Sequence, residues 1–217
     1  MNELLKRGFF GAIYVVIMWS GTAYSERTFQ ILFLVLGLWS IYEMWKLRKG
    51  KPKLVALLMV IIPFFTIQLF GMTDSNYPEM PFNPSLVLLM YILTWTFDSF
   101  AYLIGRKLGK TKILPLISPK KSWEGFLGGY LFCILASSLS YFIFKDYFNH
   151  ISTLSYILIT LILPFSATTG DFIESYYKRK AGVKDSGKIM PGHGGILDRM
   201  DAFLITIPVI YIIINIT

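Results

Sequence analysis

Seven stretches of nearly uninterrupted apolar residues run through this 217-residue chain, and 54% of its residues are hydrophobic, which is more than soluble proteins contain. Most stretches approach the ~20 residues that a helix needs to cross a bilayer core. Lipid offers the backbone no hydrogen-bond partners, and the runs do not alternate as barrel strands do, so each stretch is predicted to be helical. We expect an all-α integral membrane protein, a polytopic bundle of about seven transmembrane helices. The stretches cover residues 8–24, 28–45, 54–72, 85–105, 123–144, 154–177 and 202–216.

Positive charge is distributed unevenly between the loops. Of the 21 Lys and Arg residues, only Arg27 and Lys145 lie outside the N-terminal segment and the loops after the second, fourth and sixth stretches. The positive-inside rule therefore places the N-terminus in the cytoplasm and, with seven spans, the C-terminus outside. This topology, with attraction to anionic lipid, explains the net charge of +8. No duplex-reading motif or base-stacking platform predicts a nucleic-acid partner.

Two predicted cytoplasmic loops in the second half of the chain have compositions that simple connectors do not need. Residues 106–122 combine Gly, Pro, Ser and Lys, and residues 178–201 combine these with Asp. Residues 1–24 also resemble a cleavable signal peptide, but their apolar run is longer than most, which favours a retained helix. The predicted regions are 1–84, an N-terminal transmembrane scaffold, and 85–217, a catalytic region with cytoplasmic loops 106–122 and 178–201.

Acidic side chains inside two of the apolar stretches are the first candidates for chemistry. A carboxylate such as Asp98 costs about 2.5 to 3.5 kcal/mol in the middle of a membrane helix, so it should face the bundle interior. The sixth stretch carries a single polar stripe that should face a water-filled cavity. The alternative for Asp98 is a buried acid satisfied by a neighbouring Lys or hydroxyl, purely for packing specificity. The alternative for the stripe is an interhelical hydrogen-bond seam. The stripe contains Asp171, Glu174, Ser175 and Lys178.

The segment 175–201, SYYKRKAGVKDSGKIMPGHGGILDRMD, is too charged for lipid. Its glycines would let backbone amides approach a phosphate. Asp198 and Asp201 beside such a turn suggest Mg²⁺ shared with substrate phosphates. Acids that only complement a helix N-terminus are the alternative. His193 has two open roles, as a turn cap or as a phosphate donor. The turn region also contains Lys184, Asp185, Gly194 and Gly195.

The loop ISPKKSWEGFLGG is predicted to contribute further phosphate contacts. Ser122 is a plausible N-cap, and Glu124 is favourably placed in the first turn of the fifth helix. Lys120 and Lys121, next to Ser118, are expected to bind phosphate, although membrane anchoring is their alternative role.

These residues resemble the phosphatidate cytidylyltransferase (CDP-diacylglycerol synthase) family. The resemblance extends over about residues 90–205, and Tyr177 and Met190 depart from the family pattern only conservatively. The positions that match the main motif are Ser175, Lys178, Arg179, Lys184, Asp185, Pro191, His193, Gly194, Gly195, Asp198, Arg199 and Asp201.

The resemblance implies transfer of a cytidylyl group from CTP to phosphatidic acid, which releases pyrophosphate and forms CDP-diacylglycerol. It also implies a homodimer. The acids of the site suggest Mg²⁺, with a second, monovalent cation as a further expectation. The charge distribution leads us to expect a bacterial-type inner-membrane protein with its active site facing the cytoplasm. We expect Asp171 and Asp198 to hold the metal. The catalytic candidates are Asp171, Lys184, Asp185, Asp198 and Asp201. The substrate-binding candidates are Asp98, Ser118, Lys120, Lys121, Ser122, Ser175, Lys178, Arg179, His193, Gly194, Gly195 and Arg199.

Two other functions use similar residues. A CTP-dependent lipid kinase acting on a polyprenol or phytol would release CDP instead of pyrophosphate. A transporter of a phosphorylated solute would also place charges inside a bundle, but such proteins often show a repeat in both halves. The charged elements of this chain lie almost wholly in its second half.

Overall fold

The structure of the chain, a computed structural model, describes residues 3–47, 53–71, 82–190 and 194–217. These ranges contain helices joined by loops and turns, and no strand lies within them. The helices are α1 (Glu3–Ala23), α2 (Glu26–Leu47), α3 (Lys53–Phe70), α4 (Ser85–Leu108), α5 (Trp123–Ile143), α6 (Thr153–Ala181), α7 (Leu197–Met200) and α8 (Phe203–Ile216).

The expected all-α membrane architecture is confirmed. Five helical segments are long and apolar enough to cross a bilayer, namely α2, α4, α5, α6 and the combined α7–α8 segment. The apolar parts of α1 and α3, Gly8–Ala23 and Leu54–Phe70, are shorter. The chain is therefore a multi-pass helical membrane protein.

The sixth helix is longer than its apolar stretch predicts. It continues to Ala181 and ends at Gly182, whose φ of 72° is the left-handed conformation typical of a helix C-cap. The loop predicted to begin at residue 178 therefore begins at Gly182, and Lys178 and Arg179 lie on α6. A carboxylate-bearing turn at Asp201 also separates the short helix α7 from α8.

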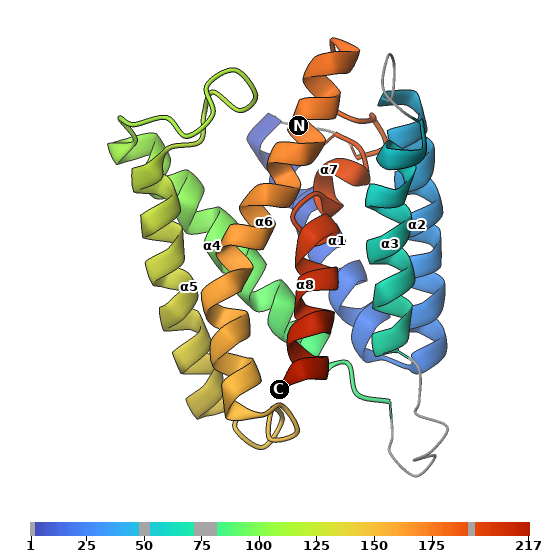
Figure 1. Ribbon diagram of the computed structural model, residues 1–217, viewed down its shortest axis with the longest axis vertical. Helices are drawn as coiled ribbons and strands as arrows, with labels where there is room; N and C mark the ends of the chain where they lie inside the picture. Colours follow the sequence, from blue (N-terminus) through green and yellow to red (C-terminus); the bar gives the residue numbers. More distant parts are fainter. Residues whose placement is uncertain (1–2, 48–52, 72–81, 191–193) are drawn as a thin grey trace.

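The helices form a bundle in which α8 packs against both α6 and α3 (Figure 1). The C-terminal ends of α4 and α6 and the N-terminus of the chain lie at one end of the bundle, while the C-terminus lies at the other (Figure 1). This arrangement agrees with the alternation of loops that the charge pattern predicts.

Glycines bring α5 unusually close to α4. Gly125 and Gly129 lie one turn apart on α5, and a Cβ at either position would meet the backbone carbonyl of Ala101 or Phe97 on α4. Small residues with this spacing let membrane helices approach at the backbone. Because Phe97 and Ala101 face α5, the rotation of α4 is set, and Asp98 is directed elsewhere in the bundle.

Candidate active site

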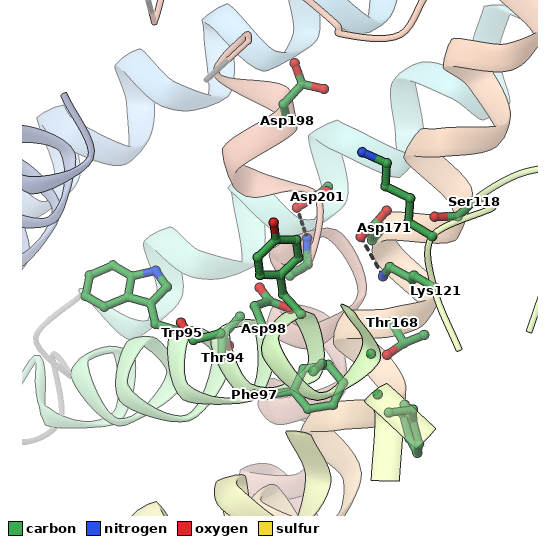
Figure 2. Close-up of a pocket in the computed structure, with 18 of the residues that line it drawn as sticks. Thr94, Trp95, Phe97, Asp98, Ser118, Lys121, Thr168, Asp171, Asp198 and Asp201 are labelled. Atoms are coloured by element: carbon green, nitrogen blue, oxygen red, sulfur yellow. Dashed lines mark hydrogen bonds and ion pairs between the residues drawn. The ribbon is translucent and has the colours of Figure 1, made fainter. Parts of the chain in front are cut away.

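A cavity of about 960 Å³ lies between α1, α4, α6, α7 and the loop that joins α4 to α5. Asp98 is far along α4 from the loop, yet its side chain is exposed because it faces this cavity. Figure 2 shows Asp98, Asp171 and Asp201 gathered around the cavity. The charged residues that line it are Asp98, Arg106, Lys112, Lys120, Lys121, Asp171, Asp198, Arg199 and Asp201.

The polar stripe of α6 supplies Asp171, whose two oxygens have different partners. Lys121 Nζ lies 2.5 Å from Asp171 Oδ2, so the loop before α5 is tied to α6 (Figure 2). The Ser175 hydroxyl, one turn along the stripe, donates to Asp171 Oδ1 at 3.0 Å. Lys121 is therefore placed on an acid of the cavity, and Ser175 supports that acid.

The Asp198 carboxylate organises the segment between α6 and α7. Its Oδ2 accepts hydrogen bonds from the backbone N–H groups of Ser186 and Gly195 at 2.8 and 2.7 Å. The Ser186 hydroxyl lies 3.0 Å from the same oxygen, and Lys178 Nζ donates to Oδ1 at 2.8 Å. Asp198 is thus buried and firmly oriented at the wall of the cavity.

Lys178 joins Asp198 to a second carboxylate of α6. Its ammonium group forms an ion pair with Glu174, whose side chain is completely buried. One ammonium group therefore contacts two buried carboxyl groups, and its single positive charge offsets one of their negative charges, which matters because an unpaired charge is costly in a buried position. Lys178 lies behind the cavity wall rather than on its surface.

Asp201 and Arg199 line the cavity on the turn from α7 to α8. Asp201 is close enough to Asp98 and Asp171 to interact with both electrostatically, and its Oδ1 accepts a hydrogen bond from the N–H of Ala202 at 2.7 Å. Arg199 Nε is buried, and no hydrogen-bond acceptor reaches it from the part of the chain that the structure describes.

The loop before α5 is held at both of its ends. Ser122 caps α5 as predicted, because its hydroxyl accepts from the N–H of Gly125 at 3.2 Å. Glu124 does more than favour the helix N-terminus, since it accepts from the N–H of Thr111 at 3.0 and 3.2 Å. Arg179 Nε donates to the carbonyl of Ile117 at 3.2 Å. These contacts hold Ser118, Lys120 and Lys121 at the rim of the cavity.

Some predicted site residues do not line the cavity. The exposed Lys184 and Asp185 lie on the loop after α6. The N–H of Gly195 is bound to Asp198, and Gly194 has a φ of 85°. Within the described residues, these glycines therefore shape the loop around Asp198. His193 and Pro191 lie outside the described residues.

The chain is similar in sequence to known proteins. The profile of the Cytidylyltransferase family matches residues 4–217. The chain belongs to this family.

Relatives in the family carry one name over different lengths of alignment. The chain is 34% identical over 204 residues to a protein of Rickettsia bellii named phosphatidate cytidylyltransferase, which covers 92% of this chain and 83% of the relative. It is 44% identical to the protein of that name from Thermotoga maritima over 62% of this chain and 51% of the relative. With the protein of that name from Staphylococcus saprophyticus, the identity is 45% over 59% of this chain and 48% of the relative. The aligned part thus spans about half the length of the last two relatives.

Residues outside the family motif also build the site of this cytidylyltransferase-family member. Tyr14 of α1 lines the cavity, and its hydroxyl donates to the Arg199 carbonyl at 3.3 Å. Glu43 of α2 is buried against the segment that contains Ser186. The rule that marks Asp98, a carboxylate inside an apolar span, applies equally to Glu43 and would have identified it. No signal in the sequence distinguishes Tyr14 from other aromatic residues of the spans.

Proposed function

We propose that this chain transfers the cytidylyl group of CTP to phosphatidic acid, forming CDP-diacylglycerol and pyrophosphate. The observation that carries the proposal is the cavity that combines four acids with Lys and Arg side chains in a member of the cytidylyltransferase family. Relatives that align over most or half of their length are named for this activity.

The reaction requires the negative charges of the two substrates to be offset, and it does not require a strong base. A phosphate oxygen of phosphatidic acid, already an anion, attacks the α-phosphorus of CTP, and the bond between the α-phosphorus and the bridging oxygen breaks as pyrophosphate leaves. The protein must therefore hold two polyanions in line and offset their repulsion. Lys112, Lys120, Lys121 and Arg199 line the cavity and are proposed to do so. The buried Arg199 Nε, which no described acceptor reaches, is a donor available to a phosphate.

Mg²⁺ is proposed as the cofactor, with Asp171 and Asp198 as its ligands and Asp98 and Asp201 shaping the surrounding charge. The donor set fits, because all four groups offer hard oxygen ligands to one cavity. Within the described residues no three potential ligands surround one point. This suits Mg²⁺, which usually takes one or two carboxylates and completes its shell with water and substrate phosphates. When bound, the ion would neutralise charge on the reacting phosphate.

Lysines contact both proposed metal ligands. Lys121 and Lys178 are bound to one oxygen each of Asp171 and Asp198. Cation binding would therefore require Lys121, which lines the cavity, to turn toward substrate phosphates, whereas Lys178 would release Asp198 and keep its ion pair with Glu174 behind the cavity wall. A second, monovalent cation in the same acidic cavity is part of the proposal.

The lipid and the nucleotide are proposed to enter from different directions. The cavity reaches apolar and aromatic residues of α1 and α4, including Val15, Trp95 and Tyr102, and the acyl chains of phosphatidic acid are proposed to pass there. CTP would arrive through the basic loops, which the positive-inside rule assigns to the cytoplasm. A homodimer in a bacterial-type inner membrane is proposed on the family resemblance.

The activity is tested with the full chain purified in detergent. Supplied with labelled CTP, Mg²⁺ and phosphatidic acid, it should form CDP-diacylglycerol and an equal amount of pyrophosphate. Release of CDP with a phosphorylated lipid would instead identify a lipid kinase. A folded preparation that makes no lipid-linked cytidine would exclude the proposed reaction.

The metal ligands are tested separately in the same assay. Asp171→Asn and Asp198→Asn should each lose activity by at least about 100-fold, the size expected when a group that stabilises the transition state is removed. Ser138→Ala on α5, a residue outside the cavity lining, is the matched control and should retain activity. Full activity of Asp198→Asn would leave the reaction standing and overturn the metal assignment.

A further inference from the structure

A carboxylate from the first half of the chain is buried against the segment that carries the family motif. Glu43 lies near the C-terminal end of α2 and is only 3% exposed. It lies more than 140 residues before its partners Ser186 and Leu197 in the sequence. A buried acid needs compensating donors, and here most of them come from the other half of the chain.

Both carboxylate oxygens of Glu43 are engaged. Oε2 accepts from the Ser186 hydroxyl at 2.7 Å and from the N–H of Leu197 at 2.8 Å. Oε1 accepts from the N–H of Ile196 at 3.3 Å and from Trp39 Nε1 at 3.1 Å. Two of these four donors, the N–H groups of Ile196 and Leu197, lie where the chain enters α7, which carries Asp198, and the Ser186 hydroxyl lies on the loop after α6.

The glycines of the segment leave space for this carboxylate. A Cβ added to Gly187 would meet Glu43 Oε1, and one added to Gly195 would meet both carboxylate oxygens of Glu43. This steric observation is separate from the hydrogen bonds and indicates the same partner. Gly187 and Gly195 therefore allow the loop to close on Glu43.

Ser186 and Gly195 connect Glu43 to Asp198. The Ser186 hydroxyl lies 2.7 Å from Glu43 Oε2 and 3.0 Å from Asp198 Oδ2, so its single proton is shared between the two carboxylates. Gly195, packed on Glu43, donates its N–H to Asp198 Oδ2 at 2.7 Å. A change at Glu43 is thereby transmitted to the orientation of Asp198.

We propose that Glu43 is a positioning residue of the active site, which acts through Ser186 and residues 195–197 to orient Asp198. The inference rests on the proposed function, in which Asp198 binds the cation. It makes the first half of the chain a direct contributor to the site, beyond its role in packing the bundle.

Glu43→Gln tests the proposal because it keeps the size of the side chain but removes one acceptor and the charge. Mutation of a residue that holds a metal ligand in place typically lowers metal affinity or activity by about 10- to 100-fold. We therefore expect the Mg²⁺ concentration for half-maximal activity to rise by about that factor. The amide of Leu197 should exchange with deuterium about tenfold faster, because it loses a bond to a charged acceptor. Glu26→Gln, at the opposite end of α2, should change neither quantity.

Ser186→Ala is the second variant, and it keeps the Glu43 carboxylate and its bond to Leu197. It should raise the Mg²⁺ requirement without accelerating exchange at Leu197, which separates transmission to Asp198 from loss of loop structure. Wild-type Mg²⁺ dependence and wild-type exchange in Glu43→Gln would overturn the proposal. The exchange measurement needs no turnover. If the wild-type protein were folded but inactive, the proposed reaction would be refuted, and the exchange of the Leu197 amide would still test its contact with Glu43.

Discussion

The most demanding electrostatic arrangement at the residue scale is the pair of acids around Lys178. Glu174 is completely buried and Asp198 nearly so, and a single ammonium group contacts both. Burial of this kind is tolerated only while every charge has a partner. Lys178 therefore contributes to stability and, through Asp198, to the geometry of the site.

Replacement of Lys178 by Met should destabilise the protein by about 3–5 kcal/mol, the cost of breaking a buried ion pair by removing one partner. The free energy of unfolding in mixed detergent micelles measures this. The second change Glu174→Gln should recover part of the loss, since it removes one uncompensated charge. Lys180→Met, an exposed lysine on the same helix, is the control and should have little effect. Equal stability of Lys178→Met and wild type would contradict the assignment.

A second prediction at this scale concerns His150, at the end of the bundle opposite the cavity. Asn83 Nδ2 lies 3.2 Å from His150 Nδ1, and the Ser85 hydroxyl lies 2.7 Å from Nε2. Partial burial lowers the pKa of His150 from its usual 6.5. Its contribution to stability is therefore present above pH 6.5 and is lost as the pH falls through the lowered folded-state value.

The melting temperature should consequently drop between pH 7.5 and pH 5.5, and less so in His150→Gln, which cannot take up a proton. The difference between the two proteins isolates His150 from the carboxylates that titrate in the same range. If the melting temperatures of both proteins had the same pH dependence, protonation of His150 would not destabilise the fold, and the prediction would be wrong.

At the scale of the elements, the contact between α4 and α5 decides where Asp98 points. Gly125 and Gly129 admit the α4 backbone, and the Ser122 cap and the Glu124 bond to Thr111 hold the loop between the two helices. Lys121, two residues before α5, thereby reaches Asp171 of α6. Three helices are thus joined around one cavity.

Gly129→Ala should destabilise the bundle by about 1–3 kcal/mol, since its Cβ would meet the Phe97 carbonyl and the Ala101 side chain with no flexible neighbour to move. Activity should fall with stability because α4 must shift or rotate. Gly8→Ala on α1 is the matched control, since its Cβ meets nothing within 4 Å. Thermal unfolding of the two variants checks the prediction, and an unaffected Gly129→Ala would mean that the helices separate without cost.

At the scale of the whole molecule, orientation in the membrane connects the fold to its substrates. The loop between α4 and α5 and the loop between α5 and α6 lie at opposite ends of the bundle (Figure 1). Leu116 in the first is 93% exposed, and Asp146 in the second is also exposed. Each is therefore a position where a cysteine would report the side of the membrane.

In a Cys133→Ser background, Leu116→Cys should react with an impermeant maleimide only in inverted membrane vesicles. Asp146→Cys should react only in cells with an intact inner membrane whose outer face the reagent can reach. Cys133 is the single cysteine of the sequence, so its replacement leaves the introduced cysteine as the one thiol that can be labelled. The positive-inside rule is the physical reason for this expectation. The reverse pattern of labelling would place the cavity on the outer side, away from cytoplasmic CTP.

Local sequence patterns predict much of the fold and part of the candidate site. Helix ends agree with the apolar stretches to within a few residues, and Ser122 caps α5 as its position before Trp123 predicts. Asp171 and Ser175 interact because i,i+4 spacing places them on one face. The apolar stretch ends before α6 does because the last turn of the helix is charged, and Gly182 marks the end of the helix.

The sequence by itself determined the class of protein, its spans, its charge asymmetry and the motif, since each depends on hydropathy or on residues close together in the chain. Only the tertiary structure decided which partner each charge has. Lys178 contacts Asp198 twenty residues away, and Glu43 reaches Ser186 across most of the chain. Such contacts depend on how the helices pack, and packing is specified by many side chains together rather than by any local pattern.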